Sequence, residues 1–213
     1  RHETAFAQHA DLLLTADVLA FDGIDHLHLT GITLGVSPVV RAVALTLLEA
    51  AVAARVSVSF DPNLRMNLWP DRDEMRTLVN TVAAQATVVM PGLGEGRQLT
   101  GHDDPEAVAA TYLDAGAGEV VIKLGADGAH AWTADGQTAR SRGYAVTPID
   151  TVGAGDGFAA GYLAAFLADA SLQERVDQGA AVGALVTTRR GDLTAMPTRV
   201  EVEELLTHQK IPA

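Results

Sequence analysis

The sequence contains no cysteine. Disulfide bonds and thiolate metal sites are therefore excluded, and a chain without them suits the reducing cytoplasm, where we expect this protein. Of its 213 residues, 48% are hydrophobic and 20% are charged, and 20 are glycine and 8 proline. This composition is typical of a globular protein, and the length suffices for one large α/β domain.

Basic residues are also scarce, with 15 Lys and Arg against 27 Asp and Glu, which gives a net charge of −12. Nucleic acids are bound by basic surfaces, so this balance argues against a nucleic-acid-binding protein. A single Arg or Lys could still hold a small anion on an acidic protein. No apolar run reaches the roughly 18 residues of a membrane span, and no signal peptide is evident, so we expect no membrane partner.

Strand-like and helix-like segments alternate along the chain, which predicts a mostly parallel sheet with helices on both faces. We predict strands at residues 26–29, 56–60, 87–90, 119–123 and 129–133, the last after a hairpin turn at Asp127-Gly128. We predict helices at residues 38–54, 71–84, 105–115, 155–168, 172–189 and 199–208. Ligands of such sheets bind at the carboxyl ends of the strands, so polar residues directly after strands are the first candidates for a site.

The most informative of these segments is Asp150–Phe158, which holds three glycines around one carboxylate, Asp156. It follows a β-type run, residues 144–149, and precedes an alanine-rich helix. Glycines let the backbone turn sharply beside a ligand, and a helix start directs N–H groups and a positive dipole into the turn. Asp156 could simply cap the helix, but a cap requires no Gly-Ala-Gly run before it. We interpret the segment as a site where negative charge develops.

Two further loops follow predicted strands. Asp61, Asn63 and Arg65 alternate after the second strand, and in an extended backbone they would share one face toward a phosphorylated or polyhydroxylated ligand. A polar loop with an internal Asp–Arg pair is the alternative. Glu95 begins a helix after the third strand, where the dipole favours a carboxylate in any case.

Other patterns favour structural interpretations. Arg189 and Arg190 complement the negative end of a helix that Gly191 would terminate. His26 and His28 share one face of a strand without an evident third ligand, so we expect half-buried structural histidines. The P-loop pattern is absent. The near matches to the dinucleotide fingerprint place a bulky residue where close helix packing needs a small one, which excludes a nicotinamide dehydrogenase.

Taken together, these residues resemble the ribokinase/PfkB family of carbohydrate kinases. The family signature Asp-Thr-x-Gly-Ala-Gly-Asp, followed by a helix of small residues, is matched from Asp150 through Gly161. The resemblance implies a ribokinase-like (Rossmann-like) α/β fold, with residues 1–213 forming a single nucleotide- and sugar-binding domain. The family's N-terminal portion and lid have no counterpart here. Because the chain also starts at Arg1 rather than at a methionine, we expect a portion to precede it.

Within the family, the sequence is most similar to 2-keto-3-deoxygluconate kinases. The segments that carry this similarity are Gly31–Leu34, Asp61–Arg65 with Leu68-Trp69, Pro91–Gly96 and Thr188–Asp192. The resemblance implies transfer of the γ-phosphoryl group of ATP, with Mg²⁺, to a hydroxyl of a sugar acid.

The resemblance also implies roles for individual residues. Asp156 would be the catalytic base, and Gly153, Ala154 and Gly155 would line the anion hole. Glu95 would help to organise magnesium. The residues that would contact the nucleotide are Asn63, Arg65, Lys123, Gly125, Gly128, Thr151 and the position of Ala180. The residues that would approach the sugar are Arg1, Ile32 and Asp192, together with Asp156.

Two positions depart from the family pattern. Gly92 stands where the family usually has an asparagine ahead of Glu95, and Ala180 replaces an asparagine of the nucleotide pocket. Two alternatives therefore stay open at the level of sequence: a kinase for a neutral sugar such as fructose or ribose, and a non-catalytic nucleotide- or sugar-binding protein. The partners expected are a small sugar or sugar acid and ATP, and the sequence is equally compatible with a monomer and a homo-oligomer.

Overall fold

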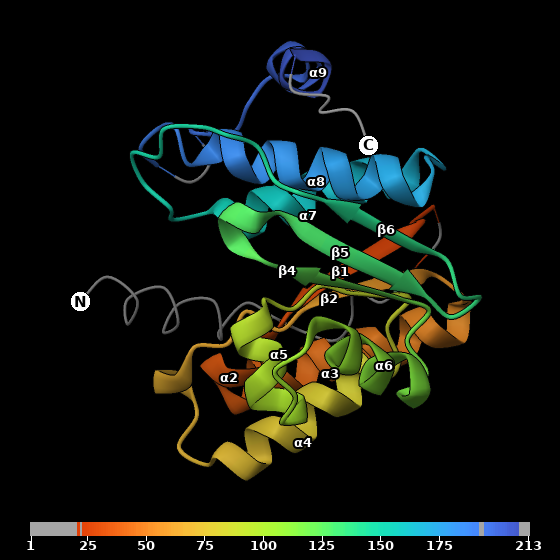
Figure 1. Ribbon diagram of the computed structural model, residues 1–213. Helices are drawn as coiled ribbons and strands as arrows, with labels where there is room; N and C mark the ends of the chain where they lie inside the picture. Colours follow the sequence, from red (N-terminus) through yellow and green to blue (C-terminus); the bar gives the residue numbers. More distant parts are fainter. Residues whose placement is uncertain (1–20, 22, 192–193, 209–213) are drawn as a thin grey trace. The chain divides into compact units, whose positions relative to one another are not determined.

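In a computed structural model, the structure describes residue 21, residues 23–191 and residues 194–208 (Figure 1). The chain divides into two compact units, Arg1–Val120 and Val121–Ala213. The strands are β1 (His26–Thr30), β2 (Ser57–Asp61), β3 (Val88–Val89), β4 (Glu119–Lys123), β5 (Ala129–Thr133) and β6 (Thr138–Ser141). The helices are α2 (Gly31–Val36), α3 (Pro38–Ala54), α4 (Arg72–Ala83), α5 (Leu93–Thr100), α6 (Pro105–Ala115), α7 (Ala154–Leu167), α8 (Leu172–Val186) and α9 (Arg199–His208), with short 3-10 turns at Met66–Leu68 and Gly125–Asp127.

The strands form one sheet in the order β1-β2-β3-β4-β5-β6. Strands β1 to β4 run parallel, and β5 and β6 pair antiparallel, so the predicted mostly parallel sheet is confirmed. The register places Thr30 beside Asp61, so β1 and β2 end at the same edge. The loops that follow these two strands therefore meet there, as expected for a ligand-binding edge.

In the first unit, local sequence signals begin the helices. Ser37, Asp71 and Asp104 each accept a hydrogen bond from a backbone N–H of the helix that follows, and proline occupies the first turn of α3 and α6. These caps satisfy donors that a helix start leaves without a partner. Figure 1 shows α3, α4 and α6 on one side of β1 and β2. Apolar side chains of these helices, such as Leu48 and Val79, are buried.

In the second unit, α7 and α8 lie side by side and in close contact (Figure 1). Added Cβ atoms at Gly157 and Gly161 would lie 2.7 Å from Val186 and Val182 methyl carbons, and one at Gly183 would lie 3.1 Å from the Ala154 carbonyl oxygen. The small residues thus permit close packing inside this unit. The first turn of α7 is consequently held directly against α8.

Two predicted elements differ clearly from the structure, and two observed elements were not predicted. Residues 144–149 form no strand, and at the end of this segment the N–H groups of Ile149 and Asp150 donate to the carbonyl of Thr187, at 2.7 and 3.1 Å. Helix α8 ends at Val186, so Gly191 is not its cap. Helix α2 and the antiparallel partner strand β6 were not predicted. Helix α2 has no side-chain cap, whereas the turn into β6 contains the favoured hairpin pair Asp135-Gly136.

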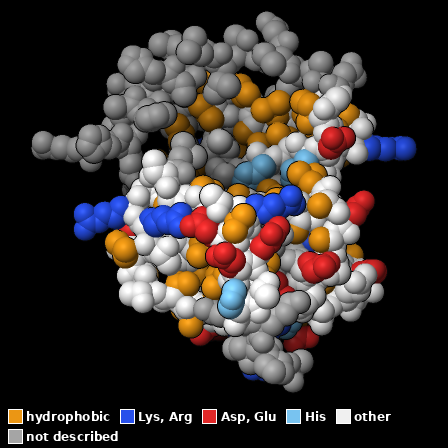
Figure 2. Space-filling view, turned by 90° about the horizontal axis from the view of Figure 1, so that it is seen from above, with side chains coloured by type: hydrophobic (Ala, Val, Ile, Leu, Met, Phe, Trp, Pro, Cys, Tyr) orange, Lys and Arg blue, Asp and Glu red, His pale blue; other side chains and the backbone are white. Residues whose placement is uncertain are grey.

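On the face seen in Figure 2, acidic side chains lie among basic ones. None of the helices in the described ranges is both long enough and apolar enough to cross a membrane.

Candidate active site

The glycine-rich segment forms a tight turn that leads directly into α7. Gly153 adopts φ 80°, a left-handed conformation that favours glycine, and its carbonyl accepts the first α-helical hydrogen bond, from Gly157 N–H at 2.8 Å. The Ala154 N–H donates to the Thr151 carbonyl at 3.3 Å. In the sequence, Gly155 and Asp156 lie between these two donors, Ala154 and Gly157. Their N–H groups therefore precede the first α-helical hydrogen bond of α7. Asp156 is exposed in the first turn of α7.

A lysine approaches this turn within the same unit. An added Cβ at Gly155 would lie 3.7 Å from Lys123 Nζ, so the ammonium group at the end of β4 reaches the start of α7. A cation, the positive end of a helix and N–H groups of the first turn are therefore close together. This combination suits a phosphate group.

The segment entering the turn is anchored at both of its ends. Asp150 Oδ1 accepts the Val152 N–H at 3.0 Å, which closes an Asx turn, and the Thr187 carbonyl holds the backbone of Ile149 and Asp150. The site is thus positioned by the last turn of α8 as well as by its own glycines. Thr151, assigned to the nucleotide, is exposed in this turn.

The predicted nucleotide turn between β4 and β5 also depends on glycine. Gly125 and Gly128 have φ 64° and 86°, and an added Cβ at Gly128 would lie 2.2 Å from the Ser141 carbonyl oxygen. Gly128 is therefore required by close packing against the end of β6 and the residues that follow it. Ala180 lies on α8 and is 7% exposed.

In the first unit, Glu95 connects two of the predicted loops. Its Oε1 accepts the Leu64 N–H at 2.7 Å, and its Oε2 accepts the Gly92 N–H at 2.8 Å. The carboxylate is therefore fixed by backbone from the loop after β2 and from the start of α5. Each oxygen has a second lone pair, so the fixed carboxylate could also accept from a metal-bound water.

The loop after β2 turns at Asn63 rather than staying extended. Asn63 has φ 36°, and its N–H donates to Oδ1 of Asp61 at 3.1 Å. The expected alternation of Asp61, Asn63 and Arg65 on one face is therefore wrong, because a left-handed residue interrupts the extended backbone. Asp61 is buried, at 2% exposure, whereas Arg65 is exposed.

Ile32 lies half-buried on α2, which begins directly after β1. An added Cβ at Gly31 would lie only 1.9 Å from the Pro62 carbonyl oxygen, so α2 touches the loop that carries Asn63. In the sequence, Gly31 is notable only as part of a family resemblance. Its physical role is to let the backbone of α2 approach the backbone of Pro62 closely. No local sequence pattern predicts this contact.

The two strand histidines belong to a hydrogen-bonded cluster with two serines of β2. His26 Nδ1 lies 2.6 Å from Ser57 Oγ, and Ser59 Oγ lies 2.8 Å from both His26 Nε2 and His28 Nδ1. Burial lowers the pKa of His26, and the neighbouring His28 lowers it further. His26 is half-buried, as expected, whereas His28 is exposed. No group of three or more potential metal-binding side chains occurs in the described part of the chain.

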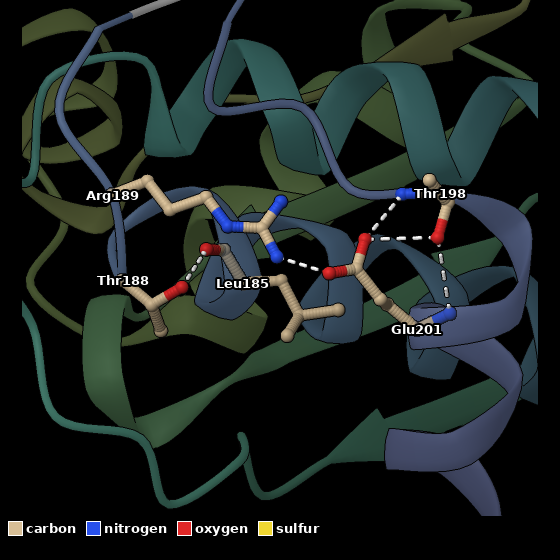
Figure 3. A network of polar contacts seen from close by, with 5 residues as sticks. All are labelled: Leu185, Thr188, Arg189, Thr198 and Glu201. Carbon is tan, nitrogen blue, oxygen red and sulfur yellow. Dashed lines mark hydrogen bonds and ion pairs between the residues drawn. The ribbon is translucent and has the colours of Figure 1, made fainter.

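The segment after α8 is held by an ion pair rather than by a helix cap (Figure 3). Arg189 Nη2 pairs with Glu201 Oε1, and Glu201 Oε2 accepts the backbone N–H and the hydroxyl of Thr198, at 2.7 and 2.9 Å. Thr198 and Glu201 form a reciprocal capping box that begins α9. Arg189 therefore does not complement the end of α8 as expected. It ties α9 to the chain just beyond α8.

This ion pair predicts a specific dependence of stability on pH. The hydrogen bond from Arg189 lowers the pKa of Glu201 to about 2, against an ordinary value of 4.5. The unfolded chain binds the proton first on acidification, so the stabilisation is complete above pH 4.5 and is lost as the pH falls toward about 2. Replacing Glu201 with Gln should lower the free energy of unfolding at neutral pH. The effect should be small, because side chains exposed by 42% and 32% are screened by solvent.

Urea unfolding of wild type and Glu201→Gln across this pH range tests the prediction. The difference between the two proteins should shrink as the pH falls. The matched control is Glu203→Gln, since Glu203 pairs with Arg199 at 3.5 Å on the same helix but with side chains exposed by 66% and 91%. A Glu201→Gln difference that is independent of pH would contradict the assignment.

The predicted residues are therefore gathered in two sets. One unit brings together Asn63, Glu95 and the α2 start beside Ile32. The other brings together Lys123 and the turn from Thr151 to Asp156. Arg1 and Asp192, both assigned to the sugar, lie outside the described residues.

Comparison with known proteins identifies the family of the chain. A family model described as pfkB family carbohydrate kinase matches residues 2–199. Over 190 residues the chain is 37% identical to 2-dehydro-3-deoxygluconokinase of Bacillus subtilis, covering 89% of this chain and 59% of that protein. Over 208 residues it is 34% identical to fructokinase-1 of Zea mays, covering 92% and 64%. The chain thus spans less than two thirds of the length of either relative.

Among solved structures, a candidate ribokinase II from E. coli in complex with ATP and Mg²⁺ matches with a TM-score of 0.82 and 28% identity, covering 95% of this chain and 63% of that one. This match confirms the predicted ribokinase-like fold.

Proposed function

Because the chain belongs to the pfkB family of carbohydrate kinases, we propose that the protein transfers the γ-phosphoryl group of ATP to a hydroxyl group of a sugar acid. The observation that carries this proposal is the start of α7, where an exposed carboxylate, a left-handed glycine and a nearby ammonium group converge. Phosphoryl transfer requires alignment and neutralisation of charge, with little covalent work by the protein. The α7 turn supplies the second of these requirements.

Asp156 is the proposed general base. It accepts the proton of the sugar hydroxyl as that oxygen attacks the γ-phosphorus and the bond to the ADP oxygen breaks. The N–H groups of Gly155 and Asp156 face the charge that develops on the transferring group. Lys123 adds a positive charge beside the same turn. Because these groups are held by backbone turns and by packing against α8, they require little rearrangement during the reaction.

Magnesium would be held on the side of Glu95. A carboxylate fixed by two backbone N–H groups suits a hard cation that keeps several water ligands, since each oxygen can also accept from a coordinated water. The ion supplies neutralisation of the β- and γ-phosphate charge when bound. Asn63 and Arg65, in the loop tied to Glu95, are the proposed nucleotide contacts. A planar guanidinium such as that of exposed Arg65 suits phosphate oxygens.

The proposed sugar acid is 2-keto-3-deoxygluconate, also named 2-dehydro-3-deoxygluconate. Its support is the 37% identity to the Bacillus subtilis enzyme of that name, together with the matching segments around Ile32, Asp61 and Pro91. Ile32, Asp192 and Arg1 are the proposed sugar residues, and Arg1 would be the cationic partner of the substrate carboxylate. Fructose is the second candidate, because fructokinase-1 of Zea mays matches 92% of the chain at 34% identity.

A substrate comparison with the full-length protein tests both candidates. ATP-dependent phosphorylation of 2-keto-3-deoxygluconate, fructose and ribose should give a kcat/KM for the sugar acid at least about tenfold above the others, because a cation placed for the carboxylate is left without a partner by a neutral sugar. Higher kcat/KM on fructose would keep the kinase and overturn the sugar acid. ATP binding without phosphorylation of any of the three would favour a non-catalytic binding protein.

A further inference from the structure

Arg41 on α3 joins three other parts of the first unit. Its Nε donates to the Leu34 carbonyl at 2.7 Å, its guanidinium carbon lies 5.2 Å from the centre of the Trp69 ring, and its Nη1 lies 2.5 Å from Glu74 Oε1. The Arg41 side chain is 25% exposed and Trp69 is 5% exposed. One side chain therefore contacts α2, the segment after β2 and α4 at the same time.

The parts joined by Arg41 are those that carry predicted site residues. Helix α2 carries Ile32, and the segment that ends at Trp69 contains Asn63 and Arg65. The helix and the segment meet at two points. Gly31 packs on the Pro62 carbonyl, and an added Cβ at Gly35 would lie 2.9 Å from Trp69 Nε1. Arg41 stabilises the second contact, between Gly35 and Trp69. Its Nε binds the Leu34 carbonyl near the end of α2, and its guanidinium covers the Trp69 ring that packs on α2.

The three contacts of Arg41 differ in strength. The Leu34 carbonyl belongs to the last turn of a helix, where carbonyls lack an intrahelical donor, so a charged donor satisfies an otherwise unpaired group. A guanidinium stacked on a buried indole adds a cation–π interaction. The Glu74 side chain is 50% exposed, and such ion pairs contribute little. The carbonyl bond and the stacking therefore dominate.

We propose that Arg41 is a positioning residue that holds α2 and the segment through Trp69 in one fixed arrangement. It does not touch the reacting groups. It acts through Leu34 and Trp69, and so determines where Ile32 lies relative to the loop of Asn63. The consequence for sugar binding rests on the proposed kinase function, whereas the arrangement itself does not. A lysine cannot replace Arg41, because an ammonium group cannot both stack as a plane and direct a fixed donor at the carbonyl.

The kinetic test compares Arg41→Lys, Arg41→Met and Glu74→Gln in the full-length protein. Both Arg41 variants should raise the KM for the sugar about tenfold with little change in kcat, because a misplaced α2 weakens ground-state and transition-state binding equally. Glu74→Gln should stay within about twofold of wild type, because it removes only the exposed ion pair. The matched control is Arg76→Met. Arg76 also donates Nε to a carbonyl, that of Gln98, and lies near a carboxylate, but it is 55% exposed.

A second measurement is independent of activity. Trp69 and Trp132 are the only tryptophans in the sequence, so a Trp132→Phe background reports on Trp69 alone. Arg41→Met should shift the Trp69 emission to the red and speed hydrogen exchange of amides in residues 31–36, whereas Arg76→Met should change neither.

The outcomes separate the two proposals. Normal emission, normal exchange and a normal sugar KM in Arg41→Lys would overturn the positioning role. A lower melting temperature with an unchanged sugar KM would also overturn it, because that result describes a purely structural residue. A third outcome is that the wild-type protein phosphorylates none of the sugars, while Arg41→Met still alters the Trp69 emission and the hydrogen exchange. That outcome would support the arrangement held by Arg41 and overturn the proposed kinase function.

Discussion

Replacing Asp156 with Asn is expected to lower kcat by roughly two to four orders of magnitude, the usual contribution of a general base. The amide has nearly the shape of the carboxylate but cannot accept the proton of the attacking hydroxyl. Asp156 is exposed in the first turn of α7, so the substitution removes no core contact. The fold should therefore persist, with a slight loss of stability from the weaker interaction with the helix dipole. Steady-state kinetics with ATP and the preferred sugar, alongside thermal unfolding, measures both effects.

Asp169→Asn is the matched control. Asp169 lies just beyond the other end of α7, is exposed and has φ 54°, a conformation that asparagine tolerates as readily as aspartate. The same chemical change there should leave kcat within about twofold of wild type, as is usual for surface substitutions away from a site. A wild-type kcat in Asp156→Asn would assign the base to another residue. Equal losses in both variants would indicate a general effect of lost negative charge.

Replacing Gly31 with Ala is expected to destabilise the protein by about 3 kcal/mol, at the upper end of what overpacking produces. The added Cβ would lie 1.9 Å from the oxygen and 2.9 Å from the carbon of the Pro62 carbonyl, and backbone atoms cannot rotate away as a side chain can. The loop with Asn63 and the start of α2 would have to separate. Since these carry proposed nucleotide and sugar contacts, both KM values should rise together. Urea unfolding and steady-state kinetics provide the measurements.

Gly94→Ala serves as the control for stability. Gly94 lies in the first turn of α5, and an added Cβ there would meet no atom within 4 Å. Because alanine favours a helix over glycine by about 1 kcal/mol, this variant should be as stable as wild type or slightly more stable. If Gly31→Ala unfolded at the same urea concentration as Gly94→Ala, the close approach of Gly31 to Pro62 would not exist in solution.

Much of the fold could be predicted because its signals are local. Helices α3 and α6 have the predicted bounds, because Ser37-Pro38 and Asp104-Pro105 specify a cap and a first turn within a few residues. The predicted hairpin region contains the 3-10 turn Gly125–Asp127 between the neighbouring strands β4 and β5. Residues 144–149 were wrong for the opposite reason. Their alternation suits a strand, but Thr187, about 40 residues away, takes the hydrogen bonds at their end.

By itself, the sequence determined most of the strands and helices and the turn that presents Asp156, because periodicity, caps and glycine conformations act between near neighbours. Only the tertiary structure decided what fixes the candidate site. Glu95 is bound by the N–H of Leu64, 31 residues away, and Arg41 of α3 stacks on Trp69 in the segment after β2. The sequence around one partner of such a pair does not indicate which residue the other partner is. Their contact arises only when burial of the apolar faces brings separate elements together, and this packing orients the groups that the sequence supplies.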